Sequence, residues 1–339
     1  AKVVKQGRSV RVKLRPTTES EQKSHRLEEG IVENSYAGLF LDHALRPESA
    51  VTYRQLLWAS ILVGDIGMLM LNEVRRPELH DYTAVRTLCL SLPKTTLVRT
   101  FIEALDISQV AAEEILRQLT MDPFDLPTAF SQALWRAPLV AVPGRNEIMI
   151  LAGSARASNP VRRVDLWLQR NGAFENIGGA DMGLLFEAET RRRIVDALTK
   201  NEMLADAVAA PDAIRRQEDD DEEIDVVIRI GKTIIVGEVK CLLYPTEASE
   251  RYDHITKIEQ AAAQANRKAI WLSDNSDRLI SAIGPLPCPS EQLSYQPMVI
   301  LNHGAGLGLV VGDAIVTDRH FLTLFLESNT FVANAAVRS

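Results

Sequence analysis

The residues of this 339-residue chain best suited to do chemistry are Asp225, Glu238 and Lys240. Asp225 comes just before a β-branched run, and Glu238 and Lys240 lie near the end of a second run. Only Gly231-Lys232 separates the two runs. Glycine at the first position of a two-residue turn favours a type II′ hairpin, and pairing about that turn places Asp225 directly opposite Glu238. Lys240 is two residues beyond Glu238, so it projects from the same face of the strand.

Two carboxylates in such a pair repel each other unless a cation lies between them, because cross-strand Cβ atoms are only about 4.5–5.5 Å apart. Carboxylate oxygens are also the ligands that hard divalent cations prefer. An ordinary surface ion pair between Glu238 and Lys240 is the competing interpretation. The apolar residues on both faces of these strands favour burial instead, and with it a hard-cation site beside a fixed positive charge.

The elements around the hairpin complete an α/β pattern. The apolar spacing predicts a helix over 184–198 and another over 246–267, strands over 269–273 and 298–302, and a final helix over 318–327. Glu187 on the first helix is expected to face the core, with Glu189 as its competitor. On the second helix Gln260 and Gln264 share one face.

Together these residues resemble the PD-(D/E)XK nuclease superfamily. Its core has a helix bearing a Glu, here Glu187, then an Asp on one strand and Glu-x-Lys on the next, here Asp225 and Glu238-Val239-Lys240. A helix with polar residues follows, where Gln260 lies, and then another strand. The resemblance covers residues 183–275, with 298–302 as an extra strand; Ile224 stands where the motif has proline.

The resemblance implies a restriction-endonuclease-like mixed sheet flanked by helices, and a Mg²⁺-dependent hydrolase of phosphodiester bonds in duplex DNA. Asp225, Glu238 and the backbone carbonyl of Val239 would hold Mg²⁺, or Mn²⁺ as a substitute, and Glu187 would complete or orient the shell. Lys240 would position or deprotonate the attacking water. Gln260 is the fifth residue that the resemblance assigns to catalysis.

The rest of the chain is organised by composition. Residues 1–30 are basic and predict an arm or an edge strand; residues 31–136 are mainly helical, with the best window at 97–119 and a kink or turn near 106–108. Residues 137–182 predict a hairpin and a helix that connect to a nuclease domain over 183–339. The net charge of −7 is carried by seven acids within 218–225, so the remainder is neutral and a polyanionic partner is not excluded. The acids before Ile224 predict a solvated loop.

Composition also excludes several classes of protein. With 46% hydrophobic and 24% charged residues the chain is neither disordered nor fibrous, and three scattered cysteines favour neither a disulfide framework nor a zinc site. The longest apolar segment, 56–71, is interrupted by Ser60, Gly64 and Asp65, so no membrane span is expected. A cytoplasmic protein is predicted.

Two other functions remain open. One is a non-catalytic nucleic-acid-binding or assembly module of the same fold, and the other is a nuclease specific for RNA or for a nucleic-acid structure. Homo-oligomer formation or a partner protein is compatible with both. The run Arg191-Arg192-Arg193 is expected either to steer a phosphate backbone or to form a solvated face. A role in defence against foreign DNA is an analogy with the superfamily.

Overall fold

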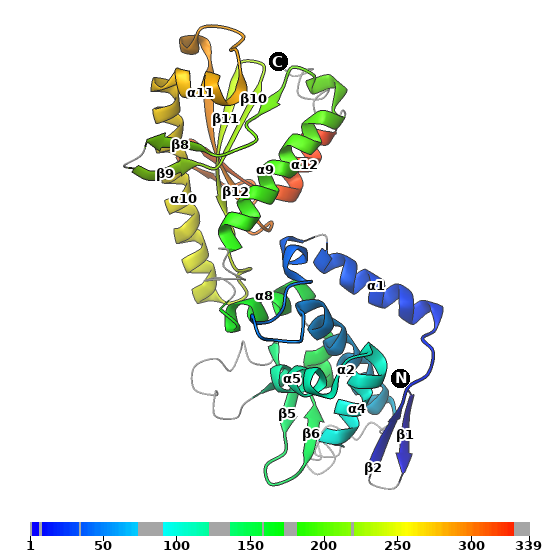
Figure 1. The fold of residues 1–339 in the computed structure, drawn as a ribbon. Coiled ribbons are helices and arrows are strands. Elements are labelled where there is room, and N and C mark those ends of the chain that lie inside the picture. The colour runs from blue at the N-terminus through cyan, green and yellow to red at the C-terminus, as the bar shows by residue number, and fades with distance from the viewer. Residues whose placement is uncertain are drawn as a thin grey trace. The chain divides into compact units, whose positions relative to one another are not determined.

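The computed structural model describes residues 2–6, 9–33, 35–73, 91–121, 136–157, 159–172, 182–217 and 220–328. The chain divides into two compact units, residues 1–179 and 180–339. Both combine helices with β-sheets, which confirms the predicted α/β class (Figure 1).

The first unit is built on helices, with a hairpin and a small sheet beside them. Its elements are β1 (Lys2–Gln6), β2 (Ser9–Lys13), α1 (Glu19–Glu33), η1 (Tyr36–Phe40), α2 (Tyr53–Glu73), β3 (Ser91–Pro93), α4 (Lys94–Leu105), α5 (Gln109–Leu119), β4 (Thr120–Met121), β5 (Leu139–Ala141), β6 (Glu147–Ile150), α7 (Ala152–Ala157) and α8 (Pro160–Arg170). The sheet order is β3-β6-β5-β4. Residues 137–172, predicted as part of a connection, therefore belong to this unit, where β6 pairs with β3.

The predicted helix over 97–119 is two helices. Asp106 adopts a left-handed backbone with φ of 52° and ends α4, and the Ser108 hydroxyl accepts a hydrogen bond from the amide of Ala111 to begin α5. Serine is among the favoured N-cap residues because its oxygen satisfies one of the free amides at a helix start. The break thus falls at the expected place, as a complete turn.

Helix α2 is the central element of the first unit. It passes through Ser60, Gly64 and Asp65 without a break. Helix α7 packs closely against it at Gly67, where a Cβ would lie 2.9 Å from the Cβ of Ala152. Among the described residues, the segment Tyr53–Asn72 is long and apolar enough to cross a membrane, with a mean hydropathy of 1.4. Its best window is 56% buried inside the unit, and the core helix of a soluble protein meets the same criteria.

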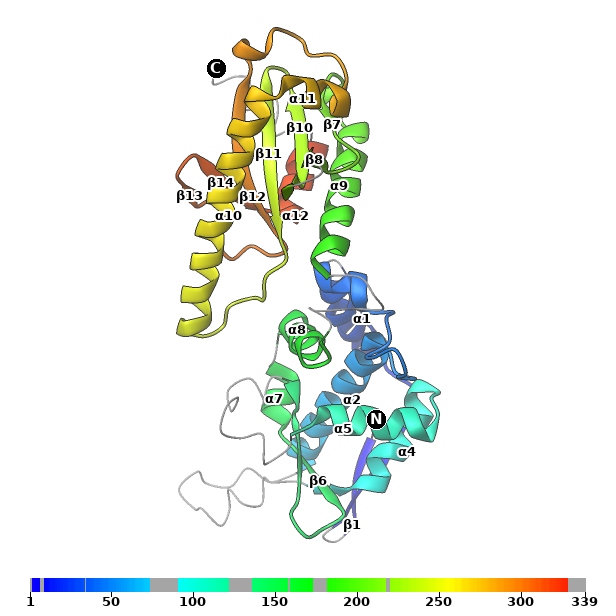
Figure 2. The ribbon, with the colours of Figure 1, turned by 60° about the vertical axis from the view of Figure 1, so that its left-hand side comes forward.

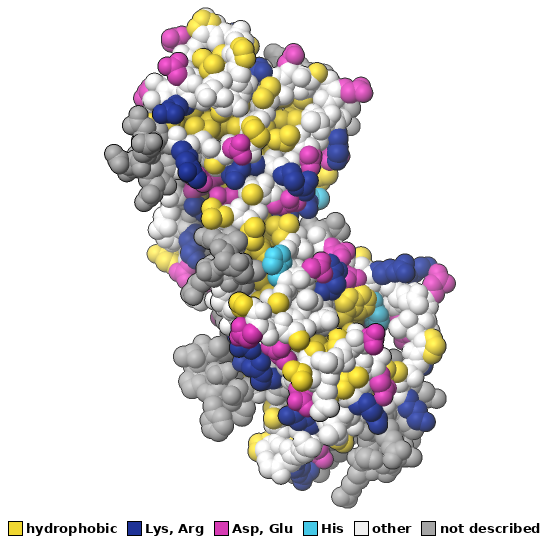
Figure 3. Space-filling view, in the orientation of Figure 1, with side chains coloured by type: hydrophobic (Ala, Val, Ile, Leu, Met, Phe, Trp, Pro, Cys, Tyr) yellow, Lys and Arg dark blue, Asp and Glu magenta, His cyan; other side chains and the backbone are white. Residues whose placement is uncertain are grey.

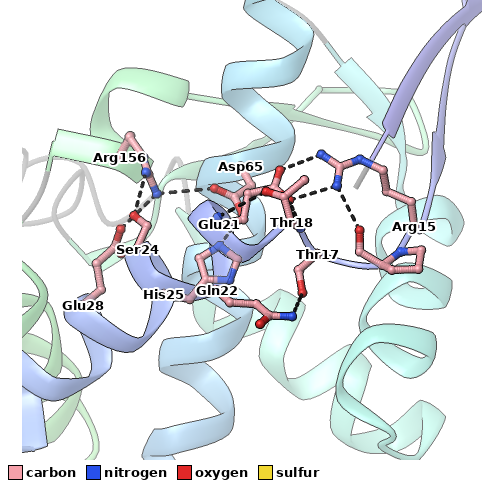
Figure 4. Close-up of polar contacts among 11 residues, drawn as sticks. Arg15, Thr17, Thr18, Glu21, Gln22, Ser24, His25, Glu28, Asp65 and Arg156 are labelled. Atoms are coloured by element: carbon pink, nitrogen blue, oxygen red, sulfur yellow. Dashed lines mark hydrogen bonds and ion pairs between the residues drawn. The ribbon is translucent and has the colours of Figure 1, made fainter.

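Polar contacts attach α1 to this helix (Figure 4). His25 lies 2.7 Å from an oxygen of Asp65, and Arg156 on α7 pairs with Glu28 at 2.9 Å and with Asp65 at 3.4 Å. Val32 is the one α1 residue among those described that is fully buried. Asp65, which interrupts the apolar sequence of α2, is therefore explained by its two polar partners, His25 and Arg156.

The second unit contains the hairpin predicted to carry chemistry. Its elements are α9 (Met182–Lys200), η3 (Glu202–Leu204), β7 (Val208–Ala209), β8 (Ile214–Gln217), β9 (Asp220–Ile224), β10 (Val226–Ile230), β11 (Thr233–Lys240), α10 (Ala248–Asp274), α11 (Ser276–Ile283), η4 (Ser290–Gln292), β12 (Ser294–Leu301), β13 (Val310–Val311), β14 (Ala314–Asp318) and α12 (Arg319–Glu327).

A mixed six-stranded sheet forms the middle layer of this unit, in the order β13-β14-β12-β11-β10-β7. Strands β11, β12 and β14 run parallel, whereas β10 is antiparallel to both β11 and β7. Helices α10 and α11 cover one face, and α9 and α12 cover the other (Figures 1 and 2). Because both faces are covered, the strands are buried and rich in β-branched residues.

Two predicted elements of this unit are wrong. Residues 269–273 are not a strand but the last turns of α10, where Ala269 and Leu272 pack on the sheet side of the helix. The acidic run is not wholly a loop, because residues 220–224 form β9 and pair with β8. Arg215 on β8 lies 3.4 Å from Glu223 on β9, so a cross-strand ion pair offsets part of the negative charge.

Candidate active site

The hairpin of β10 and β11 has the predicted register. Val226 pairs with Gly237, so Asp225, the single residue between β9 and β10, comes opposite Glu238. Gly231 begins the turn with φ of 57°. The side chains of Asp225 and Glu238 are almost fully buried, the residues being 5% and 2% exposed. The sequence therefore places two carboxylates side by side inside the unit.

The cation between these carboxylates is the ammonium group of Lys268. Its Nζ binds Oε2 of Glu238 and lies 3.3 Å from Oδ1 of Asp225. Lys268 comes from α10, which crosses this face of the sheet, and it is itself only 4% exposed. Burying two like charges together is costly, and a shared cation offsets that cost. The site is thus a compensated ionic cluster.

A second lysine completes the cluster. Lys240 Nζ lies 2.6 Å from Oε1 of Glu238, so each oxygen of that carboxylate binds an ammonium group. Lys240 keeps 34% of its side chain exposed, whereas Glu238 is buried. The predicted placement of Lys240 on the face of Glu238 is what the structure shows, and this lysine connects the buried cluster to solvent.

Backbone groups fix the orientation of Asp225. Its Oδ2 accepts a hydrogen bond of 2.7 Å from the amide of Val239, and its carbonyl oxygen accepts one of 3.0 Å from Arg191 on α9. Burial and the neighbouring Glu238 raise the pKa of Asp225, although Lys268 and the Val239 amide act in the opposite direction. The side chain of Asp225 is therefore held in one orientation, and any added positive charge would favour its ionised form.

Glu187, not Glu189, lies close enough to this cluster for the charge of Asp225 to act on it. Burial raises the pKa of Glu187 to about 7, and the charge of Asp225 adds to the effect. Glu189 is turned toward Arg192 and Arg193, which it binds at 2.8 and 2.6 Å. A single helical turn thus holds two glutamates with opposite surroundings, one close to a carboxylate and the other between guanidinium groups.

Gln260 does not reach the site. The buried stripe of α10 includes Ile258, Ala261, Ala265 and Lys268, and Gln260 lies outside that stripe and is exposed. Gln264 is half-buried one turn before Lys268, but no polar contact of its side chain is seen in the described part of the chain. The polar residue that α10 delivers to the carboxylates is Lys268, which sequence reasoning missed.

The sequence pattern around Lys268 could have predicted its burial, but the predicted helix ended one residue before it. Ending the helix at 267 and starting a strand at 269 leaves Lys268 in a connection. Carried on to Asp274, the helix places Lys268 on the same face as Ala261 and Ala265, seven and three residues earlier. A lysine within a stripe of alanines is the pattern that predicts a buried, paired ammonium group.

The three consecutive arginines of α9 have separate roles. Arg191 holds the backbone of Asp225, whereas Arg192 and Arg193 bind Glu189. Arg192 also binds Asp196 at 2.6 Å. Figure 3 shows basic and acidic side chains side by side over α9, not an uninterrupted basic surface. The run is therefore neither a simple steering patch nor a purely solvated face.

The carboxylates of this cluster suit a hard divalent cation, provided that the cation displaces the ammonium group of Lys268. Asp225 and Glu238 offer carboxylate oxygens directed at a single point, and Glu187 lies nearby, but no group of three or more His, Cys, Asp or Glu able to hold a metal occurs among the described residues. Lys268 already takes one oxygen of each carboxylate. A cation would bind here by replacing the ammonium group of Lys268. The part of the Val239 carbonyl in such a site stays a prediction.

Comparisons with known proteins give no independent assignment. No family model, no curated protein and no solved structure matches the chain. Any statement about activity therefore depends on the geometry of the cluster itself.

Proposed function

We propose that residues 180–339 form a restriction-endonuclease-like nuclease domain that hydrolyses phosphodiester bonds in DNA with the help of Mg²⁺. The observation that carries the proposal is the convergence of two buried carboxylates, Asp225 and Glu238, with Lys240 bound to the second of them. Burying an ionic cluster of this kind has a large free-energy cost and is more often found where chemistry requires it.

The order of elements supports the same proposal. The chain runs from α9 into β7, through the separate hairpin of β8 and β9, and then through β10 and β11, which with β7 form three antiparallel strands of the sheet. Helix α10 follows, and later β12, which lies parallel to β11. Helix, Asp strand, Glu-x-Lys strand, helix and strand is the order that the sequence resemblance implies. The carboxylates lie at the end of the central strand pair, between the helices of that core.

Each residue of the cluster has a chemical task in this proposal. Asp225 and Glu238 hold a divalent cation, which would polarise the scissile phosphate and lower the pKa of a bound water. Lys240 orients the attacking water or takes its proton, and its charge offsets the negative charge that builds on the phosphate. Glu187, whose pKa of about 7 lies close to neutrality, can hold or release a proton beside Asp225.

A plasmid-cleavage assay tests the proposal directly. Supercoiled DNA is incubated with the full chain in millimolar Mg²⁺ or in EDTA, and nicked and linear products are measured over time. We expect cleavage by the wild type in Mg²⁺ only, and none by Lys240→Ala. Lys232→Ala, an exposed lysine in the turn of the same hairpin, is the matched control and should cleave as the wild type does. Cleavage that survives Lys240→Ala refutes the assigned site.

A non-catalytic nucleic-acid-binding or assembly module is the second candidate, and Lys268 is the observation that favours it. An ammonium group that already neutralises both carboxylates could make the cluster purely structural. The two candidates differ in their response to metal. A structural cluster should show no change in stability with Mg²⁺ or Mn²⁺, whereas the nuclease proposal requires binding that depends on Asp225.

The remaining features of the proposal follow from the superfamily. Duplex DNA is the proposed substrate, with RNA or a specific nucleic-acid structure as outcomes that the same assay can show with other substrates. A cytoplasmic location, a homo-oligomer or partner protein, and a part in defence against foreign DNA are proposed on the same analogy.

A further inference from the structure

The second unit contains a buried arginine that forms no ion pair with any residue that the structure describes. Arg319 is the first residue of α12, directly after the carboxyl end of β14, and it is only 4% exposed. Its guanidinium carbon lies 4.9 Å from the centre of the Phe186 ring. Among the described residues its buried Nη1 has no hydrogen-bond partner, and no ion pair involves this side chain. The ring fixes the orientation of the guanidinium group without neutralising it.

The nearby carboxylate cannot supply the missing partner. Glu189 accepts two hydrogen bonds of 2.8 Å from Arg192 and one of 2.6 Å from Arg193, which occupy both of its oxygens. Arg192 also uses Asp196. One carboxylate is therefore shared by two guanidinium groups, and within the described ranges no carboxylate binds the third, that of Arg319, which only feels the charge of Glu189 at longer range.

The pKa of Arg319 reflects its burial near other guanidinium groups. Burial lowers its pKa to about 10, and the positive charge of Arg193 acts in the same direction. At neutral pH the side chain is still charged. A buried charge without a counter-ion is costly, and proteins seldom keep one without a use for it.

The position of Arg319 relates it to the candidate active site. Phe186, on which it stacks, is the neighbour of Glu187 in the chain, and Arg319 follows the carboxyl end of β14. Strands β11, β12 and β14 are parallel, and ligands of open α/β sheets bind beyond the carboxyl ends of such strands. Arg192 and Arg193 keep 59% and 38% of their side chains exposed, so the guanidinium cluster can be reached from solvent.

We infer that Arg319, together with Arg193 and Arg192, forms an anion site that binds a phosphate group next to the candidate active site. Guanidinium groups suit this ligand because their fork of N–H donors matches phosphate oxygens. The inference rests on the proposed function only for the source of the phosphate, which would be the nucleic-acid backbone away from the scissile bond. A free nucleotide presents the same chemistry.

Inorganic phosphate tests the site without any need for catalysis. Thermal unfolding of the full chain is followed in EDTA as phosphate replaces chloride at constant ionic strength. We expect phosphate to raise the midpoint of the wild type, and Arg319→Met to need at least tenfold more phosphate for the same rise. Arg278→Gln, an exposed arginine on α11, is the matched control and should respond as the wild type does.

The variant also separates a ligand site from a packing role. If Arg319 is only a packing residue, Arg319→Met lowers the midpoint without phosphate and keeps the wild-type response, which overturns the inference. If the anion site is present, the phosphate-free midpoint does not fall, because an uncompensated charge has been removed. Should Arg319→Met fail to fold, Arg193→Gln at the exposed rim decides: it must weaken the phosphate response, and an unchanged response overturns the inference.

A second arm identifies the source of the phosphate. Binding of a fluorescent 20-base-pair duplex and of adenosine monophosphate is measured in EDTA over a range of salt concentrations. For a backbone contact, Arg319→Met should reduce the slope of log K against log salt by about one. An unchanged slope with lost nucleotide binding assigns the site to a free nucleotide. A chain that binds phosphate through Arg319 but cuts no DNA would end the nuclease proposal and leave the anion site standing.

Discussion

Replacing Glu187 by glutamine is expected to stabilise the chain at alkaline pH and to leave its stability nearly unchanged near pH 4. Burial and the charge of Asp225 raise the pKa of Glu187 from 4.5 to about 7 in the folded chain. Between these values the folded chain binds a proton that the unfolded chain has lost. Stability therefore falls as the pH rises from about 4.5 to about 7, and the full cost is present above that range.

The size of the effect follows from the same values. A rise in pKa from 4.5 to about 7 corresponds to about 3 kcal/mol of differential stability. Because the carboxyl group is only partly buried, solvent screening reduces this figure to about 1–2 kcal/mol. Glu187→Gln removes the ionisable group while keeping its shape, so the variant should gain this amount relative to the wild type at pH 8.5.

Urea unfolding in EDTA at several values between pH 4 and pH 8.5 measures the difference. Glu189→Gln, from the same helical turn, is the matched control, and its effect on stability at alkaline pH should have the opposite sign. Burial opposes ionisation of Glu189, but hydrogen bonds from Arg192 and Arg193 outweigh it and lower the pKa. Glu189→Gln should therefore destabilise the chain at pH 8.5 and less so in acid. If Glu187→Gln destabilises the chain at pH 8.5, or shifts its stability equally at every pH, the placement of Glu187 beside Asp225 is wrong.

Three further predictions concern the cluster and its hairpin. Lys268→Met should cost about 3–5 kcal/mol in urea unfolding because it leaves buried Asp225 without an ammonium partner and Glu238 with Lys240 alone, and neutralising Asp225 and Glu238 in the same chain should restore much of the loss. Millimolar Mg²⁺ or Mn²⁺ should raise the unfolding midpoint of the wild type and release protons. At a hundredfold excess over Kd the free energy of unfolding should rise by about 3 kcal/mol. Asp225→Asn should lose that response and Lys240→Ala should keep it; equal stabilisation of Asp225→Asn would place the ion elsewhere. Gly231→Ala should cost about 1 kcal/mol, since φ is 57° there, without changing the response to metal; a loss under 0.3 kcal/mol would contradict the turn geometry.

The hairpin was predictable because its information is local. A strand alternates with a period of two, and Gly231 fixes the turn, so the pairing of Asp225 with Glu238 follows by counting residues from the turn. Glu187 was predicted for a similar reason, since it shares one face of α9 with Ile194, Ala197 and Leu198. Both inferences needed only short-range geometry.

Lys268 could not be reached by the same reasoning because it lies 30 residues beyond Glu238 and on another element. The run that follows it, Ala269 to Ser273, is apolar and short, and such a run fits a buried strand and a buried helical turn equally well. The prediction for the acidic residues of β9 was wrong for a related reason. Their charge predicts a solvated loop, and the strand is explained only by pairing with β8, where Arg215 faces Glu223.

The delivery of Lys268 by the crossover helix has a consequence for how the domain folds. The hairpin of β10 and β11 can form early from local contacts, but by itself it brings Asp225 and Glu238 together with no cation from α10 between them. At neutral pH their repulsion opposes the hairpin until α10 has docked. Within the hairpin Lys240 pairs with Glu238, whereas the ammonium partner of Asp225 comes from α10, so the cluster couples the two steps. A fragment ending before α10 should therefore form the hairpin more readily in acid, where the carboxylates are protonated. Asp225, Glu238 and Lys268 thus link folding of the hairpin to the arrival of the helix that follows it.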